Sequence, residues 1–216
     1  MSGLAPHTVE IFDKIASLEC IKPYILVGGT ALALQLNTRL SEDLDFQSWK
    51  SQKTQKQEVD WVQIEKELSG IGTILQRDIW DFDHVEFIVS GVKISFYVSN
   101  KFSPVTEPIQ LKDNLRVADI KAIAAMKMEV MLRRSNFRDY YDIYSILKQG
   151  INFKEVIDLS LNYSEHILST KNLLALLTDS SRFNIDKSFE LLQPIYKVTP
   201  IEIETYLKEC VKSQFK

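Results

Sequence analysis

The segment from Tyr24 to Phe46 constrains the fold more than any other part of the chain. Its apolar start, Tyr24 to Val27, is short enough for a buried strand. Gly28 and Gly29 interrupt it, and Thr30 to Leu36 has the pattern of a short helix. A strand that passes through glycines into a helix leaves backbone N–H groups pointing outward and lets an anion approach closely. The sequence therefore predicts a phosphate-binding turn here.

Two acids follow at the start of a second predicted strand, Leu44 to Gln47. Asp43 and Asp45 are two residues apart, so in an extended chain both carboxylates leave the same face, with Cα atoms roughly 6–7 Å apart. Two carboxylates beside a phosphate-binding turn can hold a divalent metal on a nucleotide. The alternative is an ordinary strand–helix turn followed by an acid at a strand edge.

Taken together, these pieces resemble the DNA polymerase beta-like nucleotidyltransferase superfamily, which has a G-G/S turn, a short helix and D-x-D on a strand. The runs G-G-T-A-L-A-L and R-L-S-E-D-L-D-F are more narrowly similar to the AbiEii/AbiGii toxin family. The resemblance implies that Asp43 and Asp45 hold Mg²⁺ on a nucleoside triphosphate. It also implies a set of nucleotide-binding residues in this segment: Gly28, Gly29, Thr30, Arg39 and Ser41.

Composition limits the class of protein. The 216 residues, 45% of them hydrophobic, can bury a sizeable core, and the formal charge of −3 leaves nucleic-acid contacts to a local patch. No apolar run of about 18 residues is present, and two cysteines without a spacing pattern argue against zinc or disulfides. Three separate histidines (His7, His84 and His166) give no support for a histidine metal site. We expect a soluble, cytoplasmic protein that makes no membrane contact.

The order of the predicted elements indicates an α/β (α+β) chain. Strand patterns cover 72–80, 84–89 and 92–98, and Ser90-Gly91 has the form of a two-residue hairpin turn. After the proline-bearing stretch 103–108 only helical patterns follow, at 117–134, 137–148, 153–161, 171–177 and 200–211. We therefore predict a nucleotidyltransferase-type mixed sheet with flanking helices in residues 1–111, and a helical domain in residues 112–216.

Lys127 lies within the apolar stripe of the predicted helix 117–134, and Arg134 falls on the same face. A cation in an apolar stripe is costly unless an anion meets it. Either Lys127 meets nucleotide phosphates with Arg134 nearby, or it snorkels from the core or pairs with a structural acid. Periodicity by itself favours the second interpretation.

The resemblance extends into this region. The family carries I-A-A-M-K, an arginine seven residues later, and then R/K-D-x-x-D, which correspond to Ile123–Lys127, Arg134 and Arg138–Asp142 here. The resemblance implies that Lys127 is a counter-charge for the phosphates. Arg138 and Asp142 can pair across one helical turn, and Asp139 can cap the helix, so we assign Arg138, Asp139 and Asp142 a structural or bridging role.

Two positions depart from the family pattern. Where the family has K-x-D on a neighbouring strand, this chain has Lys93-Ile94-Ser95, and Ala122 replaces an acid five residues before Lys127. Ser95 can act neither as a carboxylate ligand nor as a base at neutral pH. If Ser90-Gly91 is a two-residue turn, Glu86 faces Ser95 on the same side of the sheet. Glu86 is therefore a candidate for the third catalytic acid.

The main hypothesis is a Mg²⁺-dependent nucleotidyltransferase of toxin or abortive-infection type. The resemblance implies an RNA acceptor, with tRNA as one candidate, and an antitoxin protein as partner. The alternative is a catalytically impaired nucleotide-binding or regulatory protein on the same fold, because Ser95 replaces the third carboxylate. A phosphohydrolase with Asp43 as nucleophile is disfavoured, because the residues before it, 39–42, are polar rather than an apolar strand.

Overall fold

A computed structural model describes residues 2–50, 52, 58–165 and 167–214. The chain forms two compact units, Met1–Asp119 and Ile120–Lys216. The sequence predicts the change of region after Leu111. His166 and residues 51 and 53–57 lie outside the described residues.

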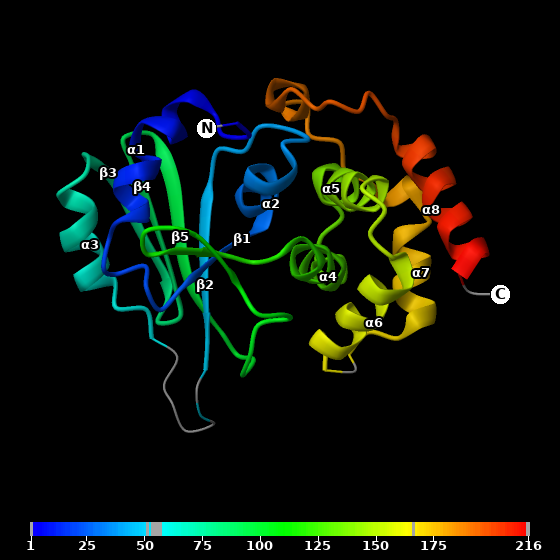
Figure 1. Ribbon diagram of the computed structural model, residues 1–216, viewed down its shortest axis with the longest axis horizontal. Coiled ribbons are helices and arrows are strands. Elements are labelled where there is room, and N and C mark those ends of the chain that lie inside the picture. Colours follow the sequence, from blue (N-terminus) through cyan, green and yellow to red (C-terminus); the bar gives the residue numbers. More distant parts are fainter. Residues whose placement is uncertain (1, 51, 53–57, 166, 215–216) are drawn as a thin grey trace. The chain divides into compact units, whose positions relative to one another are not determined.

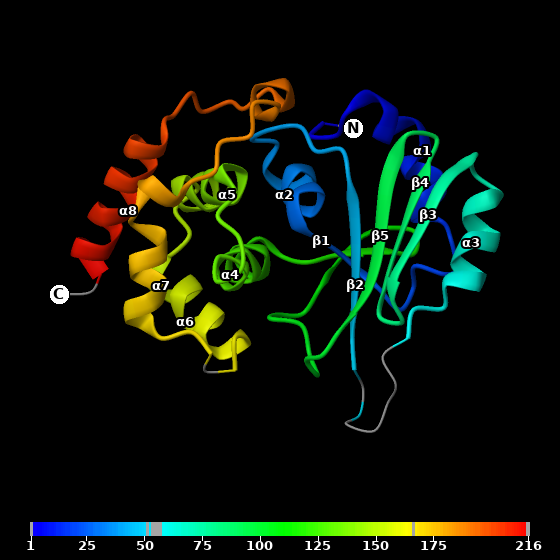
Figure 2. The same ribbon diagram turned by 180° about the vertical axis from the view of Figure 1, so that it is seen from behind.

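Unit 1 is built on a seven-stranded mixed sheet with the order β3-β4-β5-β2-β1-β7-β6 (Figures 1 and 2). Its helices are α1 (Pro6–Ala16), α2 (Gly28–Leu36) and α3 (Trp61–Ser69). The strands are β1 (Ile25–Val27), β2 (Leu44–Trp49), β3 (Ile74–Asp81), β4 (His84–Val89), β5 (Val92–Ser99), β6 (Ile109–Lys112) and β7 (Leu115–Val117). The mixed pairing, with β2 parallel to β5 and antiparallel to β1, confirms the predicted fold class.

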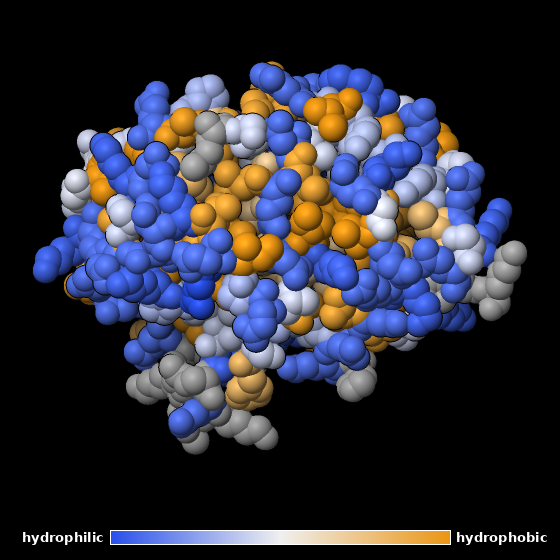
Figure 3. Space-filling model, in the orientation of Figure 1, coloured by the Kyte–Doolittle hydropathy of each residue, from blue (hydrophilic) through white to orange (hydrophobic). Residues whose placement is uncertain are grey.

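One face of this sheet packs into the hydrophobic core of unit 1. Alternate side chains of β2, β4 and β5 are buried there, among them Phe46, Phe87 and Phe96, and the rings of Phe46 and Phe96 stack 5.1 Å apart. α3 lies beside β3 in both views, and Figure 3 shows hydrophilic side chains over its outer surface. Arg77 of β3 contacts α3 through Glu65, at 2.6 Å, and through the ring of Trp61.

The hairpin between β4 and β5 has the predicted register. Ser90 and Gly91 both have positive φ angles, 50° and 85°, as a type I′ turn requires, and Val89 pairs with Val92. The right-handed twist of the flanking strands favours this turn type, and glycine meets its conformational demand at low cost. The register places Glu86 opposite Ser95, as predicted.

Strands β6 and β7 were not predicted. The sequence analysis ended the strands near Val98 and assigned Val117 to a helix, but Val117 pairs with Leu26 of β1 and with Ile109 of β6. Three- and four-residue strands carry too little periodicity to be recognised. β7 is stabilised by pairing with β1, whose residues lie far away in the sequence, and β6 pairs in turn with β7.

Unit 2 is helical, with α4 (Ile120–Val130), α5 (Phe137–Lys148), α6 (Phe153–Tyr163), α7 (Thr170–Leu177) and α8 (Pro200–Gln214). Two short 3₁₀ helices, η1 (Ser180–Arg182) and η2 (Phe189–Leu192), lie between α7 and α8. The α5 tyrosines anchor this segment: the ring of Tyr140 stacks on Phe183 at 3.6 Å, and Tyr141 meets Phe189 edge-on at 4.9 Å. Within the described residues of both units, no helix combines the length and apolar character needed to cross a membrane.

Candidate functional site

The turn from β1 into α2 brings a helix N-terminus against an acid. Gly28 is the first residue of α2 and has a φ of +71°, which glycine adopts readily. A Cβ atom at this position would lie 3.0 Å from Oδ2 of Asp45. The turn predicted to bind phosphate and the acid predicted to bind metal are therefore immediate neighbours.

Arg39 and Ser41 lie beside the second glycine. A Cβ atom at Gly29 would fall 2.6 Å from Nη2 of Arg39 and 3.1 Å from Oγ of Ser41. Both side chains are buried, and Nη1 of Arg39 donates to the carbonyl oxygen of Leu40 at 2.9 Å. The guanidinium group thus lies close to the N-terminus of α2, where both the charge and the helix dipole favour an anion.

Thr30 fixes the start of α2 to the entry of β2. Its hydroxyl lies 2.9 Å from Oγ of Ser41 and also in close contact with the backbone carbonyl oxygen of Asp43. Since a hydroxyl has a single proton, Thr30 donates to the carbonyl and accepts from Ser41. The Ser41 backbone is itself held by Ala5, whose N–H donates to the Ser41 carbonyl oxygen at 2.9 Å. This network makes Thr30 and Ser41 positioning residues for the segment that carries Asp43.

Asp43 lies in an ion pair with Lys93 of β5, with Nζ 3.5 Å from Oδ2. Both side chains are about two-fifths exposed, 42% and 41%. Ion pairs with this degree of exposure contribute about 0–1 kcal/mol to the free energy of unfolding. Separating Lys93 from Asp43 would therefore cost little free energy.

Two further acids, Glu86 and Asp78, lie in the same cross-strand row as Asp45. Asp45 pairs with Ser95, Ser95 with Glu86, and Glu86 with Asp78, so all four side chains project from one face. We call it the Asp45 face. Two strand spacings separate Asp45 from Glu86, which corresponds to about 10 Å.

The carboxylate of Glu86 is held by three neighbours on this face. It accepts hydrogen bonds from Oγ of Ser95 at 3.2 Å and from Nε1 of Trp80 at 3.1 Å, and Nε2 of His84 lies 3.5 Å away. Among the described residues, no three carboxylate, histidine or cysteine side chains gather closely enough to form a metal site. Glu86 thus shares a face with Asp45 without joining a three-acid cluster.

The predicted phosphate counter-charge, Lys127, is buried in unit 2 between two acids. Its Nζ lies 2.8 Å from Oδ1 of Asp139 and 2.8 Å from Oδ2 of Asp142, and all three side chains are at most 7% exposed. Arg134 adds two hydrogen bonds to Asp139, at 2.9 and 3.1 Å. Burial raises the pKa of Asp139, but the charges of Lys127 and Arg134 outweigh it and hold that pKa at about 2. The geometry favours pairing with structural acids, the second of the two interpretations.

Arg138 reaches a different acid from the one considered in the sequence analysis. Its Nη2 donates to Oδ2 of Asp186 at 2.7 Å, while Asp142 accepts from Lys127. Arg138 thus ties α5 to the segment before η2, and Asp142 ties α5 to α4. No local sequence pattern indicates the contact between Arg138 and Asp186, because the two residues are 48 positions apart.

Comparison with known proteins identifies the family. The family model described as "Nucleotidyl transferase AbiEii toxin, Type IV TA system" matches residues 18–197. The chain belongs to the AbiEii nucleotidyltransferase toxin family. It is 26% identical to an uncharacterized protein of Aquifex aeolicus, over 98% of each chain.

Solved structures of bacterial proteins, two of which follow, have a similar fold. JHP933 from Helicobacter pylori matches with a TM-score of 0.54 and 18% identity, over 97% of this chain and 92% of its own. MenT4, a nucleotidyltransferase toxin from Mycobacterium tuberculosis, matches with a TM-score of 0.55 and 16% identity, over 95% and 87%. The AbiEii family and the nucleotidyltransferase fold confirm the resemblance predicted from the sequence.

The donor set of this AbiEii chain fits Mg²⁺. This ion is commonly bound through one or two carboxylates together with substrate phosphates, rather than by a cage made only of protein atoms. Asp43 and Asp45 supply two carboxylates, and the Asp45 carboxylate lies so close to the backbone of Gly28 that an added Cβ would be 3.0 Å from Oδ2. The protein would therefore supply two carboxylates beside a helix N-terminus, and the substrate phosphates would have to supply the remaining ligands.

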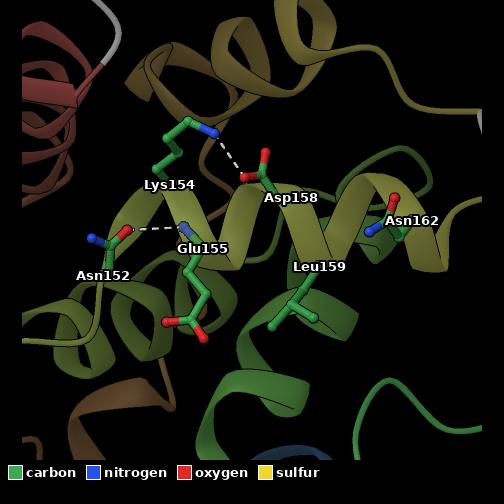
Figure 4. Close-up of a pocket in the computed structure, with 6 residues that line it drawn as sticks. All are labelled: Asn152, Lys154, Glu155, Asp158, Leu159 and Asn162. Carbon is green, nitrogen blue, oxygen red and sulfur yellow. Dashed lines mark hydrogen bonds and ion pairs between the residues drawn. The ribbon is translucent and has the colours of Figure 1, made fainter.

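A pocket in unit 2 of the AbiEii chain contains none of the predicted site residues. It runs along α6, and its lining consists of Asn152, Lys154, Glu155, Asp158, Leu159 and Asn162 (Figure 4). Several of its polar groups satisfy one another: Lys154 pairs with Asp158 at 2.8 Å, and Asn152 caps the helix at Glu155. Lys154, Asp158 and Asn152 therefore have structural roles in α6.

Proposed function

We propose that this chain transfers a nucleotide from a nucleoside triphosphate to an RNA acceptor in a Mg²⁺-dependent reaction. The observation that carries the proposal is the contact between Gly28 and the Asp45 carboxylate. It combines an anion-binding helix N-terminus with a metal-binding acid, as transfer from a polyphosphate requires. Family membership supports the same reaction class.

Each residue of the site has a role in this reaction. Asp43 and Asp45 would hold Mg²⁺, which would supply neutralisation of the phosphate charge. The α2 N-terminus at Gly28, Gly29 and Thr30 orients the polyphosphate, and Arg39 supplies a fixed positive charge. The acceptor hydroxyl attacks the α-phosphorus in line, a new P–O bond forms, and the bond to the leaving pyrophosphate breaks.

The attacking hydroxyl must lose its proton. Ser95 cannot accept it at neutral pH, whereas Glu86 carries a carboxylate on the Asp45 face. We assign Glu86 as the general base for an acceptor that lies between it and Asp45. The proton passes from the acceptor hydroxyl to Glu86 and then to solvent.

Family membership also supports a proposal for the biological setting. A type IV toxin–antitoxin assignment supports an antitoxin protein as partner and a role in abortive infection. We propose that the chain acts in the cytoplasm, where both nucleoside triphosphates and RNA, including tRNA, are available. A small protein encoded next to this chain would be the first antitoxin candidate to examine.

Incorporation of labelled nucleotide tests the proposal. Purified protein is incubated with total RNA and each of the four labelled triphosphates, with Mg²⁺ or with a chelator. We expect label in RNA with at least one triphosphate, and only with the metal. Triphosphate binding without incorporation from any of the four would contradict the proposal and favour the nucleotide-binding regulatory alternative.

A further inference from the structure

The Asp45 face carries aromatic side chains next to its row of acids. One row further along the strands, Gln47 pairs with Tyr97, and Tyr97 pairs with His84. The two rows are about 7 Å apart along the strands. The rings of His84 and Tyr97 meet edge-on, with centroids 6.1 Å apart.

Trp80 extends this aromatic group onto the edge strand β3. It lies at an irregularity in the pairing with β4, and its indole N–H donates to Glu86 at 3.1 Å, which places the ring on the Asp45 face. Even so, Trp80 is 67% exposed. The hydrogen bond orients the indole while most of the ring surface remains open to solvent.

These rings do not belong to the core. The core face of the same strands consists of the residues between them, such as Val85 and Phe96, which are at most 1% exposed. His84, Tyr97 and Trp80 occupy the opposite face, where polar side chains would be expected if the surface only met water. Exposed, oriented aromatic rings on a sheet are a recurring means of binding unpaired bases.

The charges of this face favour base stacking over phosphate contacts. Asp45, Glu86 and Asp78 share one row, and Lys93 on the same face is paired with Asp43, so the face is not a basic groove. The Glu86 carboxylate is held by Ser95 and Trp80, and Asp78 accepts from Gln76 at 2.6 Å. A partner that contributes flat, uncharged ring surface suits these side chains better than one that contributes phosphates.

We propose that Trp80, His84 and Tyr97 form a stacking platform for the unpaired bases next to the acceptor hydroxyl of a single-stranded RNA end. The proposal rests on the proposed transfer to RNA and adds where and in what form the acceptor binds. The platform lies one row from Asp45 and in contact with Glu86. An RNA end that stacks on the platform therefore presents its terminal hydroxyl to both Asp45 and Glu86.

Binding is measured with a short single-stranded RNA in the absence of triphosphate and metal, so the assay does not require activity. Stacking of one base contributes about 1–3 kcal/mol, which corresponds to about 5- to 150-fold in affinity. We expect Trp80→Ala to weaken binding within that range. Trp80→Phe keeps a ring but loses the hydrogen bond to Glu86, and should bind nearly as well as the wild type.

Two controls separate stacking from general surface effects. Phe82 is 75% exposed in the β3–β4 turn, and we expect Phe82→Ala to leave the affinity unchanged. The chain has two other tryptophans, Trp61 on α3 and Trp49 at the end of β2, so the emission of Trp80 is observed in the double variant Trp49→Phe/Trp61→Phe, where base stacking should quench it. The quenching should be largely lost in Trp80→Phe.

Three results would overturn the platform: equal affinity of Trp80→Ala and the wild type, equal affinity for an abasic strand of the same length, or equal affinity for a duplex. A loss of antitoxin binding instead of RNA binding in Trp80→Ala would also overturn it and indicate a protein interface. The proposed function fails separately, through the absence of nucleotide incorporation. If incorporation occurs and Trp80→Ala leaves the KM for RNA unchanged, only the platform is wrong.

Discussion

Gly28 and Asp45 are in such close contact that a single methyl group on Gly28 would lie 3.0 Å from the Asp45 carboxylate. Gly28 also has a φ of +71°. Two independent constraints therefore favour glycine here: the backbone conformation, and the close approach of the Asp45 carboxylate. The two constraints can be separated experimentally.

Gly28→Ala should lose both stability and nucleotide transfer. The positive φ costs about 1–2 kcal/mol for alanine, and the added methyl group displaces the Asp45 carboxylate. Gly91→Ala is the matched control, because Gly91 has a φ of +85° but no atom within 4 Å of the added Cβ. Urea unfolding should show a similar loss in both variants, while only Gly28→Ala loses transfer. Equal activities would remove Gly28 from the site.

Asp45→Asn should reduce Mg²⁺-dependent transfer by at least about 100-fold. Mutation of even an outer-shell partner of a metal ligand lowers metal affinity or activity about 10- to 100-fold, and Asp45 is proposed as a direct ligand. The fold should persist, because the side chain is only partly buried and its volume is unchanged. Asp81→Asn, at the exposed end of β3, is the control. Undiminished activity of Asp45→Asn over a Mg²⁺ titration would refute the metal assignment.

Glu86 and Ser95 test the missing third acid. If Glu86 is the base, Glu86→Gln should lower the rate constant for transfer by about 100- to 10,000-fold, and Ser95→Ala should retain most of it. Ser95→Asp places a carboxylate directly beside Asp45 on the neighbouring strand, and should partly restore transfer in the Glu86→Gln background. Full activity of Glu86→Gln alone would exclude Glu86 as the base.

Lys127→Met should destabilise the protein strongly. It leaves Asp142, which is fully buried, and Asp139 without their shared cation, and breaking such a buried pair costs about 3–5 kcal/mol. Lys154→Met removes a half-exposed cation from its pair with Asp158 and should cost less than about 1 kcal/mol. Chemical unfolding measures both. Weaker triphosphate binding with unchanged stability in Lys127→Met would instead support contact with phosphates.

Stability should fall in acid as Asp139 becomes protonated. Its pKa of about 2 lies below its ordinary value of 3.8, so its contribution is present above pH 4 and is lost as the pH falls towards 2. The shift corresponds to about 2 kcal/mol. Arg134→Met removes one of the two cations, so the pKa rises and the loss begins at higher pH. If the free energy of unfolding of Arg134→Met fell over the same pH range as that of Lys154→Met, this role of Arg134 and Asp139 would be contradicted.

Local sequence determined the parts of the site that depend on a few consecutive residues. The glycine turn, the alternation of Asp43 and Asp45 and the Ser90-Gly91 hairpin each follow from backbone preferences within a short segment. The register that places Glu86 opposite Ser95 follows from that hairpin alone, because a two-residue turn fixes every pair of its two strands.

Tertiary structure decided which distant groups meet. The strands β6 and β7 exist because β7 pairs with β1, and Lys127 is neutralised by acids that fold back from the next helix. Likewise, the contacts of Lys93 with Asp43 and of Trp80 with Glu86 depend on strands brought together by the sheet. The periodicity of the sequence shows which face of its helix or strand a side chain occupies. It does not show which charge or ring that side chain contacts, because the partner comes from another part of the chain.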